Sequence, residues 1–498
     1  MSNIRPGREE FKAGYAAGKP QLVYLKRVND LETPVSAMLK LPQEDGPRFL
    51  LESVEGGETR GRYSIIGLSP DMVWRCMGNK PELSTVPPFK DDSFEPSWDA
   101  SMASLRQLVG KHRMEIPEGV PPMAAGLVGY MGYDMVKLME RLPDSKPDPI
   151  GIPDACFMRP RAQLIFDGVD GVVYIIAPVW DVNGDADKAY DEAVARIEKL
   201  ARTLQGPLDQ RNYYKDVSVA PRQFASNMTQ AEHAAMIDRA KEYIKAGDIF
   251  QVVLGQRFTA DFDLPAFALY RSLRHMNPSP FLFYLDFGDY ALVGSSPEIL
   301  VRLRDETVTI RPIAGTRRRG KNKAEDIELA ADLLADPKEL AEHLMLLDLG
   351  RNDVGRVAKG GAVKVTEHMI IEHYSHVMHI VSNVEGTIDP KHDALDALVA
   401  GFPAGTVSGA PKIRAMEIID ELEPVRRSYY GGCVGYFSAN GTMDTCITLR
   451  TALVKDGKVI VQAGGGIVAD SVAQDEYDES TNKAKAVMRA ADEAAKFA

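Results

Sequence analysis

The chain has 498 residues, and this length favours about three domains, with two large ones equally admissible, because domains average roughly 150 residues. It contains 59 Lys and Arg residues against 71 Asp and Glu residues, a net charge of −12, so phosphate backbones and anionic lipid surfaces would repel it. We therefore expect no nucleic-acid partner. With 45% apolar and 26% charged residues, the composition is that of an ordinary globular protein.

The cysteines and the first residues of the chain indicate its compartment. Cys76, Cys156, Cys433 and Cys446 lie far apart and form no CxxC pair, which favours neither a disulfide framework nor a structural zinc site. The N-terminal segment has no apolar stretch of the kind that directs export, and the longest apolar stretch, 171–180, is about half a membrane span. We expect a cytoplasmic protein without a membrane anchor.

The first half of the chain reads as short strands bounded by turn residues, followed by a helix at 185–203 with apolar side chains at helical spacing. The expected strands lie at 48–54, 61–69, 71–78, 125–136, 162–168 and 172–180. A polar stretch without periodicity, 205–223, follows the helix and predicts a domain boundary. We therefore expect one domain at 21–205 and a second at 225–490.

The second half opens with a helix that Thr229 and Glu232 start as a capping box and Gly247 ends. Strand-like runs follow at 249–262, 280–295 and 298–313, and further helices are expected at 325–334, 337–349, 411–421 and from about 475. Asp336 is the expected N-cap of the helix at 337–349. The hairpin-like runs allow an α+β fold of two antiparallel sheets packed as a sandwich with helices outside.

The segment GTRRRGKN at 315–322 has the Gly and Lys positions of a phosphate-binding loop but Asn322 in place of the Ser or Thr that binds magnesium. Pro312 also argues against a buried central strand before it. A solvated basic turn is one interpretation, and an anion-binding turn at Gly315 and Thr316 is the more attractive one.

Four histidines fall between residues 368 and 379, which suggests a metal cluster. On one strand, His373 and His379 would face one side and His376 the other, so the set cannot converge on one ion. We expect hydrogen-bonded, half-buried histidines, one of which is a candidate general base.

Two helices carry candidate metal ligands. Apolar residues surround Glu342 on nearly every side of its expected helix, and a partly buried carboxylate needs a cationic partner. In the last helix, Glu476, Glu479 and Lys483 share one face. Glu479 and Lys483 could form an ordinary exposed ion pair; alternatively, Glu479 and Glu342 could be oxygen ligands of Mg²⁺.

Glycines supply bare backbone N–H groups. Gly464, Gly465 and Gly466 end a strand-like run, and SGAPK at 408–412 opens a helix. With Arg450 and Lys483, these segments predict a site for a small carboxylated substrate.

A set of motifs in this half resembles the chorismate-binding domain of the chorismate-utilising enzymes. They are IFQVVLGQRF (249–258), GSSPEILV (294–301), RPIAGTRRRG (311–320), ELAEHLMLLDLGRNDVGRV (339–357), FPAGTVSGAPKIRAMEII (402–419), YYGGCVGY (429–436), DTCITLRTA (444–452) and IVQAGGGIVADS (460–471). In the first half, FLLESVEGGETRGRYSIIG at 49–67 is similar to the companion domain of anthranilate synthase large subunits. The resemblance implies the two-sheet sandwich, and a lyase in which ammonia attacks C2 of chorismate and pyruvate is eliminated to leave anthranilate, the first committed step of L-tryptophan biosynthesis.

The resemblance also implies roles for individual residues. Glu342 and Glu479 would be the Mg²⁺ ligands; Glu298 would be the general acid for the departing hydroxyl, His379 the base that takes the C2 proton, and Thr406 would orient the intermediate or that histidine. The residues expected to bind the substrate are Gly315, Thr316, Tyr430, Arg450, Gly464, Gly465, Gly466 and Lys483.

Two positions discriminate among relatives. Members that add water resemble KVVL where this chain has Gln251, which cannot act as a base, so isochorismate and salicylate synthases are disfavoured. Aminodeoxychorismate synthases carry a lysine in PIKGT where this chain has Ala314. The missing lysine disfavours aminodeoxychorismate synthase, which stays the alternative activity. Ammonia attack at C2 is favoured.

Partners follow from the same resemblance. No stretch resembles the cysteine nucleophile of a glutamine amidotransferase, so we expect a separate amidotransferase subunit in a hetero-oligomer. LLES at 50–53 and NPSPFLFY at 277–284 resemble the tryptophan-binding segments of feedback-controlled enzymes. Glu52, Ser53, Pro280, Phe281 and Leu282 would line that allosteric pocket. The alternative is that LLES is an ordinary strand.

Overall fold

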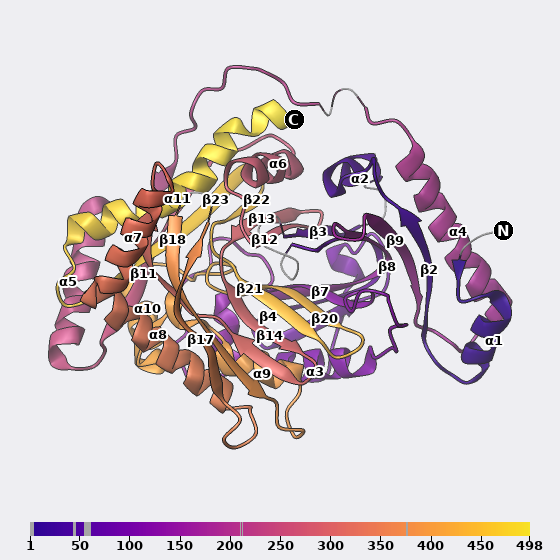
Figure 1. The fold of residues 1–498 in the computed structure, drawn as a ribbon, viewed down its shortest axis with the longest axis horizontal. Coiled ribbons are helices and arrows are strands. Elements are labelled where there is room, and N and C mark those ends of the chain that lie inside the picture. The colour runs from indigo at the N-terminus through magenta and orange to yellow at the C-terminus, as the bar shows by residue number, and fades with distance from the viewer. Residues whose placement is uncertain (1–3, 43–45, 54–60, 210, 212, 375–376) are drawn as a thin grey trace.

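The computed structural model describes residues 4–498 except 43–45, 54–60, 210, 212, 375 and 376 (Figure 1). The helices are α1 (Arg8–Ala16), α2 (Pro34–Lys40), α3 (Ser101–Lys111), α4 (Ala186–Gln205), α5 (Gln230–Ala246), α6 (Ala266–Met276), α7 (Lys323–Ala335), α8 (Pro337–Gly355), α9 (Ala394–Gly401), α10 (Lys412–Leu422) and α11 (Ala473–Glu493). A short 3-10 helix, η4 (Gly405–Val407), precedes α10.

Strands make up the centre of the molecule, and every pairing between them is antiparallel within the described residues. In the first half they are β1 (Ile4–Arg5), β2 (Gln21–Val28), β3 (Arg48–Glu52), β4 (Tyr63–Met77), β5 (Lys80–Ser84), β6 (Glu95–Pro96), β7 (Gly126–Met131), β8 (Ala155–Asp167) and β9 (Val172–Val179). In the second half they are β10 (Ala225–Ser226), β11 (Gln251–Asp261), β12 (Phe281–Asp286), β13 (Tyr290–Ser296), β14 (Ile299–Arg304), β15 (Thr307–Ile310), β16 (Ile313–Arg318), β17 (Lys364–His373), β18 (Val377–Thr387), β19 (Gly409–Ala410), β20 (Cys433–Ser438), β21 (Met443–Ile447), β22 (Thr451–Lys455) and β23 (Lys458–Ile467).

These strands form two sheets that share the long strands β4 and β8. One sheet runs from β4 through β3, β12, β13, β22 and β23 to β11. The other runs from β8 through β7, β20, β21, β14 and β15 to β18. The pairings β3 with β12 and β7 with β20 join the two halves of the chain, so each sheet contains strands from both.

Three apolar layers show that the sheets pack face to face with helices outside. Alternate residues of β12 lie on opposite faces: Phe283 packs between the two sheets, whereas Leu282 and Tyr284 pack under α6 and α11. Tyr130 of β7 reaches Tyr290 of β13 across the sandwich, with 3.0 Å between their hydroxyl oxygens. Helices α8 and α9 cover strands β14, β15 and β18 of the second sheet, whereas α5 and α10 pack against β11. Figure 1 shows helices at both margins and strands in the middle.

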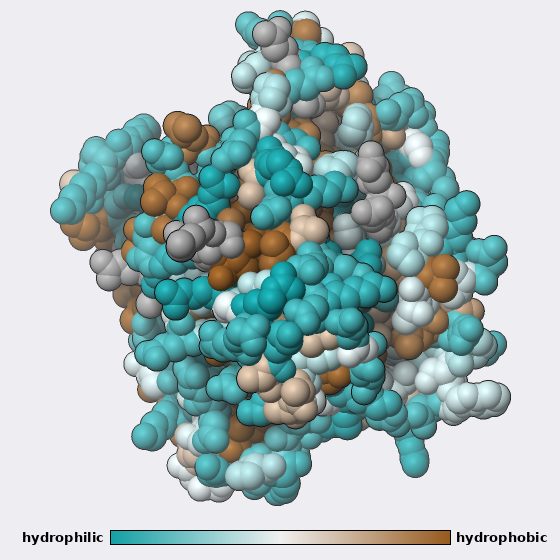
Figure 2. All heavy atoms as spheres, turned by 90° about the vertical axis from the view of Figure 1, so that its right-hand side faces the viewer, coloured by the Kyte–Doolittle hydropathy of each residue, from teal (hydrophilic) through white to brown (hydrophobic). Residues whose placement is uncertain are grey.

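The predicted fold class is therefore confirmed, and so are most element ends. Thr229 and Glu232 form the capping box of α5, which ends at Gly247 in the left-handed conformation, and Asp336 caps α8 through its side chain. Between α4 and β10, the described residues form no strand and no α-helix. Within the described residues, no helix combines the length and the apolar composition needed to cross a bilayer. The face in Figure 2 is mostly hydrophilic, with a small apolar group near its centre.

Some predictions about local structure are wrong. The runs 61–69 and 71–78 form the single strand β4, and the run 125–136 is a strand only to Met131, with a 3-10 helix at Tyr133–Leu138.

The predicted basic turn is also different. Residues 313–318 form strand β16, which pairs with β18, instead of an isolated basic turn. The pairing register shifts between Ala314 and Arg317, and Gly315 lies in this irregular stretch with φ +68°. Glycine adopts that conformation without steric cost, so the expected turn survives as an irregularity inside a strand.

Candidate active site

The glycine segment, residues 464–466, lies at the end of a strand as the sequence predicts, because β23 ends at Ile467. Gly464, Gly465 and Gly466 pair with Gly255, Leu254 and Val253 of β11. A Cβ atom on Gly465 would lie 2.9 Å from Glu476 Oε2 and 3.8 Å from Glu479 Oε1, and a Cβ atom on Gly466 would lie 2.1 Å from Gln251 Nε2. Side chains of α11 and β11 therefore lie directly against this backbone, and a Cβ atom here would displace their polar ends.

Carboxylates from two helices meet at this strand. Gln251 Nε2 donates to Glu342 Oε1 of α8 at 3.2 Å. On α11, Glu476 Oε1 accepts a hydrogen bond from Ser471 Oγ at 2.6 Å, while Glu476 Oε2 is buried without a partner in the part of the chain that the structure describes. Burial raises the pKa of Glu476, and the nearby charge of Glu479 adds to the rise. An orphaned, electron-rich oxygen of this kind calls for a cation or a proton.

The exposed ion pair considered for the last helix is present. Lys483 Nζ lies 2.7 Å from Glu479 Oε1, with both side chains about half exposed, and it also donates to Gly464 O at 3.1 Å. Among the described residues, no three His, Cys, Asp or Glu side chains are grouped so that they alone could hold a metal ion. Mg²⁺ characteristically takes only one or two protein carboxylates.

The surroundings of Glu342 differ from the prediction. Leu344 is 48% exposed, and Ala341 and Asp348 are exposed on the same side of α8, so the helix is not buried all round. The leucines of this segment wrongly predicted burial on all sides, because single leucines are common on the surface of proteins. Glu342 is half-buried, with Gln251 as a neutral partner.

His379 lies on β18, and its ring orientation is fixed by the irregular part of β16. Its Nδ1 lies 2.8 Å from Gly315 O and 3.2 Å from Thr316 Oγ1. Because a carbonyl oxygen can only accept, Nδ1 carries the proton in the neutral ring and Nε2 keeps the lone pair. Burial lowers the pKa of His379, and the nearby Arg450 charge lowers it further. The ring is therefore a neutral base at physiological pH.

The arrangement of the other histidines corrects the single-strand prediction. His373 lies on β17 and His379 on the neighbouring antiparallel strand β18, which pairs Glu372 with His379. His376 lies outside the described residues. His343 on α8 is fully buried and bonds Ser382 Oγ, so it belongs to the interior.

Glu298 and Thr406 come together from distant segments. Thr406 Oγ1 of η4 lies 3.0 and 3.2 Å from the two carboxyl oxygens of Glu298, which follows β13. Glu298 is 7% exposed, and burial raises its pKa to about 8, although the Thr406 hydroxyl opposes the shift. The carboxyl is consequently protonated at neutral pH and can donate a proton.

Tyr430 and Arg450 complete the set of predicted substrate residues. Tyr430 is buried, and burial raises the pKa of its hydroxyl to about 12, opposed by the nearby Arg427 charge and by a hydrogen bond with the Gly464 backbone. Arg450 has φ +47°, and its carbonyl accepts from Ser295 N at 3.2 Å. The positive charge of the Arg450 side chain contributes to the lowered pKa of His379.

The sequence did not single out Glu339. A Cβ atom on Gly315 would lie 3.2 Å from Glu339 Oε2, and burial raises the pKa of Glu339. Glu339 precedes Glu342 by one helical turn, as Glu476 precedes Glu479, so each helix presents two carboxylates on one face. That repeated spacing was the available signal.

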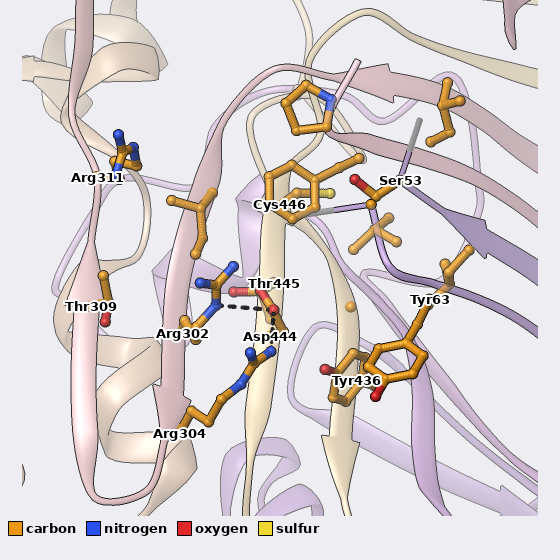
Figure 3. A pocket seen from close by; sticks show the side chains of 18 of the residues that line it. Ser53, Tyr63, Arg302, Arg304, Thr309, Arg311, Tyr436, Asp444, Thr445 and Cys446 are labelled. Carbon is orange, nitrogen blue, oxygen red and sulfur yellow. Dashed lines mark hydrogen bonds and ion pairs between the residues drawn. The ribbon is translucent and has the colours of Figure 1, made fainter. Parts of the chain in front are cut away.

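A separate cavity of about 830 Å³ lies between the two sheets, and all five residues of the predicted allosteric pocket line it: Glu52, Ser53, Pro280, Phe281 and Leu282. Leu282 pairs with Glu52 across β12 and β3. Glu52 is 5% exposed and accepts hydrogen bonds from Tyr270 Oη at 2.5 Å and from Arg274 Nε at 2.6 Å. In Figure 3, Ser53 lies on one wall, and Arg302 and Arg304 reach Asp444 on another.

Comparison with known proteins gives consistent matches over nearly the whole chain. Residues 47–489 match the family model described as chorismate binding enzyme. The chain is 55% identical over 492 residues to anthranilate synthase component 1 of Cereibacter sphaeroides, covering 98% of each chain, and 47% identical over 491 residues to that of Pseudomonas aeruginosa, covering 97% of this chain and 98% of the relative. The crystal structure of anthranilate synthase component I from Streptococcus pneumoniae superposes with a TM-score of 0.78 at 35% identity, covering 93% of this chain and 99% of that one. These matches confirm the resemblance inferred from the motifs.

Proposed function

The chain belongs to the family of chorismate binding enzymes, and we propose that it converts chorismate and ammonia into anthranilate and pyruvate, as the large subunit of an anthranilate synthase. The observation that carries this proposal is the similarity to anthranilate synthase component 1 over 98% of both chains. Gln251 and Ala314 support it, because neither can act as the lysine expected in relatives that add water or that attack chorismate covalently.

Chorismate is a dianion, and the site offers donors and positive charge for its two carboxylates. Arg450, Lys483 and Thr316 would bind them with the backbone of the glycine segment, and the Tyr430 hydroxyl would contact the same carboxylates or a hydroxyl group. Gly315 would contribute its backbone beside Thr316. The buried position of Tyr430 supports a directed hydrogen bond that water does not compete for.

Proton transfer would use the two perturbed groups. When ammonia forms a bond to C2, the C4 hydroxyl leaves and takes the proton of Glu298, which burial keeps neutral at pH 7. Thr406 would hold that carboxyl in place through its hydroxyl. His379 would then take the C2 proton on Nε2 as pyruvate is eliminated.

The donor set near the glycine segment fits Mg²⁺. Glu342 and Glu479 would hold the ion, with Glu476 Oε2 as the buried oxygen that lacks a partner among the described residues. Glu479 would exchange its contact with Lys483 for the metal. When bound, Mg²⁺ would anchor the ring carboxylate of chorismate and spread the negative charge that develops during substitution.

Two partners complete the proposal. Ammonia would come from glutamine through a separate amidotransferase subunit, anthranilate synthase component II, in a hetero-oligomer of the cytoplasm. L-tryptophan would occupy the cavity between the sheets and inhibit turnover, with Pro280 and Phe281 facing the indole. Glu52 and Leu282 would line the cavity from the paired strands β3 and β12, although their side chains pack toward α6.

The decisive experiment measures anthranilate fluorescence with the purified chain, chorismate, Mg²⁺ and ammonium chloride. We expect product formation that EDTA abolishes and added Mg²⁺ restores, and no product when glutamine replaces ammonium. Glu342→Gln should require far more Mg²⁺ for the same rate. Unchanged turnover in Glu342→Gln would end both the metal assignment and the mechanism, and aminodeoxychorismate in place of anthranilate would support the alternative activity.

A further inference from the structure

A buried ion pair connects three parts of the active site. Arg427 and Glu423 lie between α10 and β20, and they are 2% and 6% exposed. Arg427 Nε donates to Glu423 Oε2 at 2.9 Å and Arg427 Nη2 to Glu423 Oε1 at 2.5 Å, a two-pronged contact between guanidinium and carboxylate.

The remaining contacts of the pair go to segments that carry substrate-site residues. Arg427 Nη1 donates to the carbonyl of Val407, the neighbour of Thr406, at 2.5 Å, and Nη2 donates to the carbonyl of Val253 at 2.7 Å. Glu423 Oε1 accepts from the backbone N–H of Gly255 at 2.8 Å. The guanidinium also lies 5.6 Å from the centre of the Tyr430 ring.

From these contacts, and resting on the proposed function, we infer that Arg427 is a positioning residue: with Glu423 it holds the Thr406 turn, the Tyr430 ring and strand β11 in one fixed arrangement. Through β11 the arrangement extends to the glycine segment, because Val253 pairs with Gly466 and Gly255 with Gly464.

Stability alone explains the pair poorly. Taking two charges out of water carries a large desolvation cost, and replacing a buried ion pair by apolar side chains of similar volume is often neutral or stabilising. The planar guanidinium instead satisfies a carboxylate and two carbonyls at set directions, which an apolar side chain cannot do. What the pair supplies is the relative position of those backbone segments.

The test uses Arg427→Lys, which keeps the charge but lacks the fork of donors. We expect kcat with ammonium to fall at least tenfold and chorismate affinity, measured by calorimetry with Mg²⁺, to weaken. We also expect the alkaline limb of the kcat/KM profile to move to higher pH, because a displaced Thr406 hydroxyl no longer favours the ionised form of Glu298. Thr406→Val should move the limb in the same direction.

The double variant distinguishes a positioning role from independent damage. If Arg427 acts through Thr406, adding Arg427→Lys to Thr406→Val moves the alkaline limb no further; additive shifts, or no shift in Arg427→Lys, would overturn the inference. Arg414→Lys is the matched control and should behave as the wild type, since Arg414 lies on the surface of α10 and donates through Nε and Nη2 to Oδ2 of Asp248.

A further double variant covers the case in which Arg427→Lys does not fold. Glu423→Leu with Arg427→Met removes both charges, and we expect a folded protein with the same shifted limb and weakened chorismate binding. Wild-type behaviour of this variant, or loss of the fold in both, would overturn the positioning role. If the wild type binds chorismate but forms no anthranilate, the proposed function fails while the chorismate affinities still test Arg427.

Discussion

Glu298 is the predicted general acid, and its buried environment differs strongly from that of a carboxyl group in water. Burial raises its pKa to about 8, so the acid form is present at pH 7 and is lost above about pH 8. We expect kcat/KM to decline as the pH rises through that value. In Glu298→Gln, the rate should fall by about 10²–10⁴ and this alkaline decline should vanish, which rate measurements across pH 6–10 would reveal. A retained decline would assign it to another group.

The same burial makes Glu298 a cost to stability. A carboxyl group with a folded pKa above its unfolded value favours the native state below the unfolded pKa, and this contribution is lost as the pH rises through the folded pKa, here from about 4.5 to about 8. Glu298→Gln removes the titration. We therefore expect the melting temperature of Glu298→Gln minus that of the wild type to be larger at pH 8 than at pH 5. Equal differences at the two pH values would contradict the raised pKa.

Adding one methyl group at Gly465 tests the proposed metal site. In Gly465→Ala the new Cβ would lie 2.9 Å from Glu476 Oε2, so the carboxyl must move. We expect the Mg²⁺ concentration for half-maximal anthranilate formation to rise about tenfold. Gly360→Ala is the control, because its Cβ would have no neighbour within 4 Å. An unchanged Mg²⁺ requirement would remove Glu476 from the metal's surroundings.

At the scale of elements, helix α8 depends on Asp336, whose side chain accepts from the backbone of Lys338 at 3.0 Å and Glu339 at 3.4 Å and pairs with Arg317 at 2.8 Å. Asp336→Ala should lower the free energy of unfolding by about 1 kcal/mol, whereas Asp336→Asn keeps the cap and should lose less. Urea denaturation of both variants separates the cap from the ion pair. Equal losses would assign the effect to the Arg317 contact.

The elements that were predictable from sequence are those with local causes. Thr229, Asp336 and Gly247 set helix ends through contacts within a few residues, and the structure has them there. Strand β16 was missed because its pairing with β18 is nonlocal, and the His373–His379 segment was misread because its two ends belong to the paired strands β17 and β18. The Glu298–Thr406 contact joins separate segments, so only the family resemblance could group these residues in advance.

On the scale of the whole molecule, the cavity lies where β3 and β12 join the two halves, so its occupant contacts both. We expect L-tryptophan to inhibit by favouring an inactive relative placement of the two expected domains, at 21–205 and 225–490. Linkage then requires chorismate to weaken tryptophan binding by the factor that tryptophan weakens chorismate binding. Calorimetric titrations with each ligand, alone and with the other, check this reciprocity.

Ser53→Phe would fill part of that cavity and should abolish tryptophan binding while anthranilate formation persists. Thr203→Ala on α4 is a control outside the cavity lining, where the hydroxyl donates to the Lys199 carbonyl of the same helix. Equal tryptophan affinity in Ser53→Phe and the wild type would remove Ser53 from the site, and absence of binding to the wild type would end the proposal.

The interleaved strands also have a consequence for the chain while it is being made. When α4 leaves the ribosome, β3 lacks β12 and β7 lacks β20, so both present unpaired backbone edges. At roughly 5–20 residues per second, synthesis of the missing partners takes on the order of tens of seconds. For that interval these two strand edges of the nascent N-terminal half are templates for pairing with other chains.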